Sequence, residues 1–187
     1  MSGATHASAG APAVGAPTAT SDAPPVLSRA TLAAASRGAV ELPDAALLEL
    51  PEKALQFGTG AFLRGFVDAF LDAANRQGRF GGRVVVVGST GSGRDRAFAE
   101  QDGLYTLVTR GIAEGAPVEE RRIVASVSRA LSAVDEWDAV LAVARSPELE
   151  VIFSNTTEIG IALDEGDAPD LAPPRSFPGK LAVVLHE

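Results

Sequence analysis

Apolar and polar residues between positions 53 and 88 follow a strand pattern, then a helix pattern, then a strand pattern again. The apolar run 54–57 ends in Gly58-Thr59-Gly60, as expected for a buried strand that meets a tight turn. An amphipathic helix is predicted directly after it, and Gly78 is expected to end that helix. Its apolar stripe consists of Phe62, Phe66, Val67, Phe70, Leu71 and Ala74, with Arg64, Asp68 and Asp72 on another face. The run 83–88 has no polar alternation and predicts a parallel strand that is covered on both faces.

The alternation of strands and helices continues to the end of the chain. Strands are expected at 104–108 and 122–127, and they could form an edge hairpin around a turn region at 111–115. A helix is expected over 133–144, with Asp135 and Glu136 in its first turn. A buried strand is expected at 150–154, and an apolar helix from Pro178 onward. This order indicates an α/β fold with a mainly parallel sheet flanked by helices.

The first forty residues differ from the rest. Residues 1–26 are mostly Ala, Gly, Pro, Ser and Thr without a periodic apolar face, so we predict a disordered extension over 1–40 and one domain over 41–187. A short helix is a candidate around Thr31–Ser36. Because residues 1–26 lack both the basic region and the apolar stretch of a secretory signal, we expect a cytoplasmic protein.

Composition and charge exclude several classes of function. The 187 residues include 16 Lys and Arg against 24 Asp and Glu, and a net charge of −8 argues against nucleic acid or an anionic membrane as a partner. No apolar run reaches the roughly 18 residues of a membrane-spanning helix. With no cysteine and only His6 and His186, both near the chain ends, we expect no metal site, no thiol nucleophile and no Ser-His-Asp hydrolase.

The Gly58-Thr59-Gly60 turn carries the candidate binding chemistry. Glycine at 58 permits a tight turn, and glycine at 60 omits the Cβ that would keep a pyrophosphate away from the amides at the positive end of the next helix. Leu63 occupies the third glycine position of the dinucleotide-binding G-x-G-x-x-G pattern. A strand-to-helix turn without a ligand is therefore the alternative.

The loop after the next strand bears on which dinucleotide would bind. Residues 88–93 contain no carboxylate for the ribose 2′-hydroxyl of NAD. Arg94 and Arg96 follow, and an arginine at such a position can accept the 2′-phosphate of NADP. A solvated loop is the alternative for these two arginines, and the loop alone leaves NAD and NADP both open.

Four ordered segments carry a resemblance to a known family. They are 55–68 (LQFGTGAFLRGFVD), 101–106 (QDGLYT), 153–161 (FSNTTEIGI) and 176–181 (SFPGKL). Over roughly residues 50–187 the chain resembles the N-terminal half of the polyol-specific long-chain dehydrogenases, the mannitol dehydrogenase family, and in particular their tagaturonate reductase (altronate oxidoreductase) branch. The resemblance implies a Rossmann-type domain that binds NAD(H), a following, mostly helical substrate domain, and hydride transfer between D-tagaturonate and D-altronate in hexuronate catabolism, without a metal.

The resemblance also implies roles for individual residues. The cofactor is expected at Phe57, Gly58, Thr59, Gly60, Ala61, Phe62 and Leu63, and near the nicotinamide at Asn155. Glu158 matches an acid that lies beside the catalytic lysine and the proton path in the mannitol relatives. Turn capping by Asn155 and a solvated helix start at Glu158 are the alternative interpretations.

The family's catalytic lysine has no counterpart here. It belongs to a Lys-x-x-x-x-Asn-x-x-His arrangement in the second domain, whereas this chain has only Lys53 and Lys180, and Leu185 stands where the asparagine would follow Lys180. We therefore expect a truncated or incomplete chain, the cofactor-binding half of the enzyme, which is inactive alone and meets its sugar-acid substrate only with the C-terminal domain.

Two other functions stay open on the sequence. One is a fructuronate- or mannitol-type polyol dehydrogenase, because the choice of sugar depends on the second domain. The other is a non-catalytic nucleotide-binding or partner-binding module, in which another chain covers the apolar residues of the last helix. Those residues are Leu181, Val183, Val184 and Leu185.

Overall fold

A four-stranded parallel sheet forms the centre of the domain in the computed structural model, which describes residues 26–32, 40–88, 98–168 and 171–187. Its strands are β1 (Glu52–Phe57), β2 (Arg83–Gly88), β5 (Val127–Ser132) and β6 (Val151–Ser154). They lie in the order β5–β2–β1–β6, and each neighbouring pair is parallel. In chain order this is 3-2-1-4, the first part of the Rossmann strand order. The predicted α/β fold with a mainly parallel sheet is confirmed.

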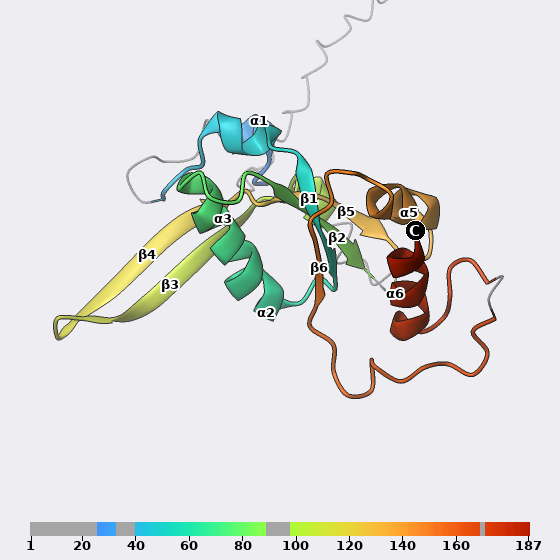
Figure 1. Ribbon diagram of the computed structural model, residues 1–187. Helices are drawn as coiled ribbons and strands as arrows, with labels where there is room; N and C mark the ends of the chain where they lie inside the picture. The colour runs from blue at the N-terminus through green and yellow to red at the C-terminus, as the bar shows by residue number, and fades with distance from the viewer. Residues whose placement is uncertain (1–25, 33–39, 89–97, 169–170) are drawn as a thin grey trace, which may run out of the picture.

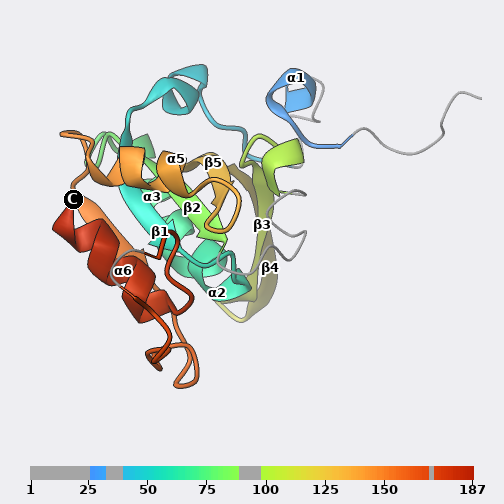
Figure 2. The same cartoon turned by 90° about the vertical axis from the view of Figure 1, so that its right-hand side faces the viewer.

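Helices cover both faces of this sheet (Figure 1). The connection from β1 to β2 is one continuous helix made of α2 (Ala61–Leu63), a π-helical turn η2 (Arg64–Asp68) and α3 (Ala69–Arg76). On the other face lie α5 (Trp137–Ala144) and α6 (Phe177–His186), and Figure 2 shows them on the same side of the sheet. Every residue of β2 is buried, as predicted, because its side chains alternate between the two layers. Val84 and Val86 pack on the α3 side, and Val85 and Val87 pack on the α5 side.

The continuous helix between β1 and β2 turns a polar face to the core. Its amphipathic pattern would ordinarily bury the phenylalanines, yet Phe62, Phe66 and Phe70 are 50–66% exposed, whereas Asp68 and Asp72 are buried. The three rings contact one another along the outer face, with centroids 4.9 Å and 6.2 Å apart. Gly78 adopts a φ of 66° just after the helix, which confirms the predicted end.

Specific hydrogen bonds fix this orientation. Asp72 Oδ1 accepts from the Ala125 amide at 2.8 Å, and Ser126 Oγ donates to the Asp68 carbonyl oxygen at 2.7 Å. Asn75 Nδ2 donates to the Gly82 carbonyl oxygen at 2.7 Å. These partners stand on other segments of the chain, so the pattern within the helix does not reveal them.

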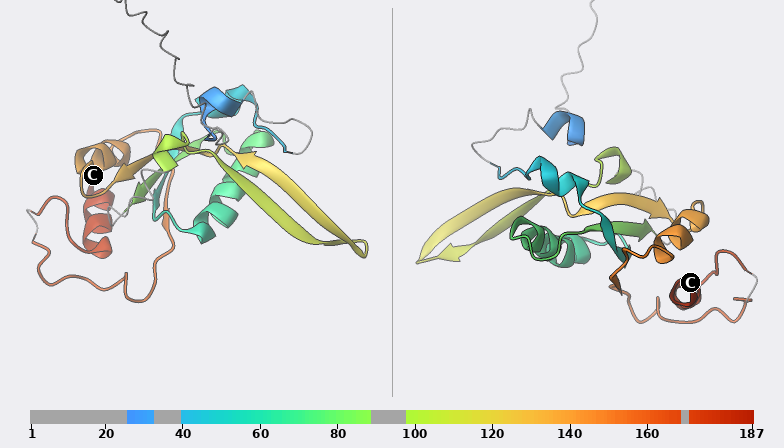
Figure 3. Two further views of the ribbon diagram at one scale, coloured as in Figure 1. Left: turned by 180° about the vertical axis from the view of Figure 1, so that it is seen from behind. Right: turned by 45° about the horizontal axis from the view of Figure 1, so that its top comes forward.

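Strands β3 (Tyr105–Ala113) and β4 (Ala116–Val124) form an antiparallel hairpin that projects from the body of the domain (Figure 3). Its turn has positive φ at Glu114 and Gly115, as a tight hairpin requires. The predicted hairpin is confirmed, but it forms a sheet of its own rather than an edge of the main sheet. The expected strand 122–127 is also divided, since Val124 ends β4 and Val127 begins β5. The hydrogen bonds from Ala125 and Ser126 to the helix hold the chain where it changes sheets.

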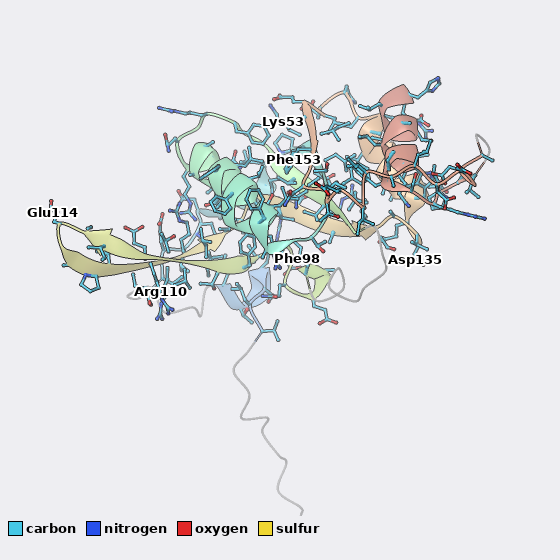
Figure 4. The ribbon with its side chains drawn as sticks, turned by 90° about the horizontal axis from the view of Figure 1, so that it is seen from below. Lys53, Phe98, Arg110, Glu114, Asp135 and Phe153 are labelled. Carbon is cyan, nitrogen blue, oxygen red and sulfur yellow. The ribbon has the colours of Figure 1, made fainter. Side chains whose placement is uncertain are left out.

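Two expected elements differ from the structure in detail. The helix predicted over 133–144 begins at Trp137, because Ser132 bonds to Asp135 through its hydroxyl and to Glu136 through its amide and closes a turn before the helix. Figure 4 shows Asp135 at the end of the molecule opposite to Glu114 on the hairpin tip. The strand predicted as buried, β6, lies at the sheet edge and is partly exposed.

Other residues of the same chain cover the apolar side chains of the last helix, α6, more fully than the sequence suggests. Val184 is buried, and Leu181 and Val183 are half-buried against the cluster that contains Trp137. Leu185, at 67%, is the one of the four apolar residues that is largely exposed. A second chain is therefore not needed to cover most of this helix.

The segment before β1 packs on the hairpin end of the domain. It contains α1 (Arg29–Leu32) and a 3₁₀ turn η1 (Ala45–Glu49). Leu27, Leu32, Val40 and Leu42 pack against a cluster around Leu48, Leu104 and Ile123. The helix expected around Thr31–Ser36 is therefore seen at 29–32, and residues 33–36 lie outside the described residues. None of the helices in the described segments is long and apolar enough to cross a membrane.

Candidate functional site

The Gly58-Thr59-Gly60 turn connects the carboxyl end of β1 to α2, as predicted. Gly58 has a φ of 109°, which strongly favours glycine, and its amide donates to the Val87 carbonyl oxygen at 2.9 Å. Gly60 is the N-cap residue, and a Cβ placed on it would meet no atom of the described residues within 4 Å. The first amides of a helix have no partner within the helix. The turn therefore leaves open space in front of backbone amides that can bind an anion.

Asn155 lies at the same edge of the sheet as this turn. The pairing of β1 with β6 places Phe57 opposite Ser154, so Asn155 leaves β6 at the level where Gly58 leaves β1. The strand order reverses between these two strands, since β2 and β5 lie on one side of β1 and β6 lies on the other. Open α/β sheets bind ligands beyond the carboxyl ends of their strands at such a point.

The predicted cofactor residues divide into buried and accessible ones. Phe57 and Leu63 are buried, and the Phe57 ring packs edge-on against Phe177 with centroids 5.5 Å apart. These two side chains hold the turn from inside the domain. The accessible members of the set are Gly58, Thr59, Gly60, Ala61, Phe62 and Asn155.

The remaining predicted residues lie farther along the chain. Glu158 is exposed and lies in a turn after Asn155 rather than at the start of a helix. The loop 89–93, Arg94 and Arg96, which bear on the choice between NAD and NADP, lie outside the described residues.

Sequence reasoning missed two buried polar residues, Gln56 next to the turn and Asp68 in η2. Gln56 Nε2 donates to the Gly58 carbonyl oxygen at 2.9 Å, while Gln56 Oε1 and both carboxylate oxygens of Asp68 have no hydrogen-bond partner in the described part of the chain. Burial raises the pKa of Asp68 to about 7, against the opposing effects of the Gln56 amide and the Arg64 charge. The signal in the sequence was a single polar residue within the apolar run 54–57.

Both lysines already have partners. Lys53, at the amino end of β1, pairs with Glu150 at 2.6 Å, and this hydrogen bond raises the pKa of the lysine. Lys180 is buried and donates to the Arg175 carbonyl oxygen at 2.7 Å, and burial lowers its pKa. Neither ammonium group is therefore free to serve a substrate.

Comparison with known proteins agrees with this geometry. The model of the mannitol dehydrogenase Rossmann domain matches residues 52–187. The altronate oxidoreductase of Halalkalibacterium halodurans is 48% identical over 139 residues, and that of Bacillus subtilis is 44% identical over 138 residues. These matches cover 73% and 74% of this chain but 27% and 29% of the relatives, so the chain spans less than a third of their length.

Two solved structures share the fold. Mannitol 2-dehydrogenase of Pseudomonas fluorescens, solved as a ternary complex with NAD and D-mannitol, superposes with a TM-score of 0.71 at 24% identity, over 86% of this chain and 35% of that one. A D-sorbitol dehydrogenase in substrate-free form gives a TM-score of 0.68 at 21% identity, over 86% and 36%. The family model covers most of the chain, and the strand order and the glycine turn are those of a Rossmann domain. The chain therefore belongs to the mannitol dehydrogenase family and carries its Rossmann domain.

Proposed function

We propose that this chain is the cofactor-binding part of an NAD-dependent oxidoreductase that interconverts D-tagaturonate and D-altronate in the cytoplasm. The observation that carries the proposal is the position of the open Gly58–Gly60 turn and Asn155 at the point where the strand order reverses. The altronate oxidoreductases, at 42–48% identity, support the choice of substrates. The NAD complex of the mannitol 2-dehydrogenase supports the choice of cofactor.

The residues of the turn fit a dinucleotide. Gly58 and Gly60 would let a pyrophosphate come close to the backbone. The amides of Ala61, Phe62 and Leu63, at the positive end of the helix, would bind its negative charge. Asn155 offers a side-chain amide for the nicotinamide end. The bound cofactor would supply the hydride acceptor or donor.

The proton of the sugar alcohol needs a separate group. Of the residues at this edge, Glu158 is an exposed carboxylate, and we assign it to the proton path. Lys53 and Lys180 are occupied elsewhere, so this chain should bind the cofactor without turning over substrate. The proposed organisation is an N-terminal extension over 1–40, of which Leu27, Leu32 and Val40 pack on the domain, and a dinucleotide-binding domain over 41–187. A further domain would hold the sugar acid, and the greater length of the relatives leaves room for such a domain.

The first experiment titrates residues 1–187 with NADH and with NADPH by nucleotide fluorescence. We expect tighter binding of NADH and no oxidation of it when tagaturonate, fructuronate or fructose is added. The absence of binding would contradict the proposed cofactor site, and tagaturonate-dependent oxidation by this chain would contradict the need for a further domain.

A second experiment compares the mass of the natural protein, by blot of its source cells, with the 19.1 kDa of this chain. The same three sugars are then tested on that natural form. Preference for tagaturonate is expected, whereas preference for fructuronate or fructose would assign the protein to another branch of the family. A species near 19.1 kDa without activity would favour a non-catalytic module.

A further inference from the structure

The outer side of the helix between β1 and β2 carries three exposed aromatic rings. Phe62, Phe66 and Phe70 are 50–66% exposed, and neighbouring rings contact each other with centroids 4.9 Å and 6.2 Å apart. We call these three side chains the phenylalanine face. Single exposed apolar side chains are ordinary on a protein surface, whereas a contiguous group of them marks a surface that contacts another molecule or domain.

A π-helical turn brings the three rings toward one line. In a regular α-helix, residues four positions apart are rotated by about 40° around the axis, so three such residues spread over the surface. The π-helical turn η2 (Arg64–Asp68) lies between the first ring and the third and has more residues per turn. The rings therefore point in more similar directions than a regular helix would allow. Such turns occur frequently at functional sites.

The charged side chains of this helix are held away from the phenylalanine face. Asp68 and Asp72 are buried, and Arg76 is bonded to Asp72 at 2.7 Å and to the Ile123 carbonyl oxygen at 2.9 Å. The Arg64 guanidinium group lies over the ring of Phe98, at 5.8 Å from its centroid. The face is therefore suited to an apolar partner surface rather than to a charged ligand.

The size of the phenylalanine face favours a partner that belongs to the same polypeptide. A phenylalanine buries roughly 150–250 Å² when it is covered, so three half-exposed rings offer on the order of 300 Å². A stable interface between separate chains needs about 800 Å² on each side. Contacts between domains of one chain bury about 600–1,500 Å² in total, or about half of that on each side. The face is too small for a stable dimer and large enough to orient a linked domain.

The relatives are long enough to contain such a domain. The altronate oxidoreductases of Halalkalibacterium halodurans and Bacillus subtilis have more than two thirds of their length outside the match with this chain. The position of the face is also suitable, because Phe62 stands in the first turn of the helix, two residues after Gly60. A domain that covers this ring would lie next to the proposed cofactor turn.

We propose that the phenylalanine face is the surface on which the sugar-acid-binding domain docks through an apolar surface of its own. The inference rests on the proposed function, which requires such a domain. Burial of the rings stabilises the docked arrangement through the hydrophobic effect. The contact orients the bound sugar acid toward the cofactor, and hydride transfer depends steeply on that orientation.

Photo-crosslinking identifies what covers the phenylalanine face. The natural form of the protein is produced with the substitution Phe66→p-benzoylphenylalanine, illuminated and analysed by mass spectrometry. Ile112→p-benzoylphenylalanine is the matched control, because Ile112 is an exposed apolar residue on the projecting hairpin. We expect position 66 to crosslink to a residue beyond position 187 of the same chain, and position 112 to form no such crosslink.

A double substitution tests the consequence for the reaction. Phe66→Ser combined with Phe70→Ser changes the face outside the cofactor turn. In residues 1–187 its NADH affinity should stay within about twofold of wild type, because both rings are exposed there. In the natural form, kcat/KM for the preferred sugar acid should fall about tenfold or more, with NADH affinity unchanged. Ile112→Ser should leave both quantities unchanged.

A crosslink between two chains would assign the face to a second copy and overturn the inference. So would the absence of any crosslink from position 66 beyond residue 187, or full activity of the double variant in the natural form. A natural form of 19.1 kDa would overturn it together with the need for a further domain. All these results leave NADH binding by residues 1–187 intact, whereas absence of that binding in wild type would contradict the proposed cofactor site and leave the crosslinking result valid.

Discussion

The carboxylate of Asp72 accepts a hydrogen bond from the backbone amide of Ala125 at 2.8 Å and so ties α3 to the segment between β4 and β5. Its other oxygen accepts from Arg76 Nε at 2.7 Å, and the side chain is almost completely buried. These contacts hold the helix with its acidic residues inward and its phenylalanines outward.

Replacement of Asp72 by alanine should destabilise the domain strongly. The change leaves the Ala125 amide buried without its acceptor and removes the buried one of the two ion pairs of Arg76, for an expected loss of about 2–4 kcal/mol. Urea unfolding followed by circular dichroism measures it. Asp138→Ala, at an exposed position, should stay within about 0.5 kcal/mol of wild type. Equal losses in the two variants would show that the Asp72 contacts do not hold the helix.

Replacement of Phe66 by serine should have little effect on stability. The ring is half exposed and contacts mainly Phe62 and Phe70, so the expected loss is under about 1 kcal/mol. Leu63→Ser on the same helix removes a buried side chain and should cost about 2–5 kcal/mol. The same unfolding experiment compares them, and a large loss for Phe66→Ser would mean that the phenylalanine face is buried in solution.

The Gly60→Ala substitution should weaken NADH binding without destabilising the fold. Gly60 has ordinary extended backbone angles, and none of the described residues would crowd the new Cβ, so the melting temperature should stay within about 2 °C of wild type. The added methyl group stands where the pyrophosphate would approach, and NADH affinity should fall about tenfold or more.

Gly103→Ala provides the contrast to Gly60→Ala. Gly103 has a φ of 74°, and its Cβ would lie 2.7 Å from the Val127 carbonyl oxygen, so this variant should melt well below wild type. Differential scanning fluorimetry and NADH titration check both variants. Unchanged NADH affinity in a folded Gly60→Ala variant would exclude close approach of the cofactor to this turn.

The stability of the domain should fall with rising pH through the range in which Asp68 titrates. Its pKa in the folded state, about 7, lies above the ordinary value of 3.8, so the folded state holds the proton more tightly and loses stability as the proton leaves. Between about pH 5 and pH 8, wild type should lose roughly 2–3 kcal/mol relative to Asp68→Asn.

The chosen range avoids Glu52. Burial opposes the ionisation of Glu52, but hydrogen bonds from Arg129 and Ser128 outweigh it and lower the pKa of Glu52 below 4.5. Glu52 is therefore mostly ionised already at the start of the range. Urea unfolding of both proteins at several pH values gives the difference, and a constant difference across the range would show that Asp68 titrates normally.

Much of the fold could be predicted because the relevant signals are local. The strand 83–88 can be recognised from an uninterrupted apolar run, and the turn at Gly58 can be recognised from two glycines that follow a strand. The division of the run 122–127 between two sheets could not be predicted. It depends on hydrogen bonds from Ala125 and Ser126 to a helix more than fifty residues earlier.

The sequence by itself determined the order of strands and helices, the glycine turn between β1 and α2 and the family resemblance, because periodicity and turn chemistry act over a few neighbouring residues. The tertiary structure decided which face of the helix is buried, that Asn155 lies level with Gly58, and that the polar residues Gln56 and Asp68 are buried. These features arise from contacts between residues that are distant in the chain. Their energies depend on burial and on hydrogen-bond partners, which a pattern along one segment does not contain.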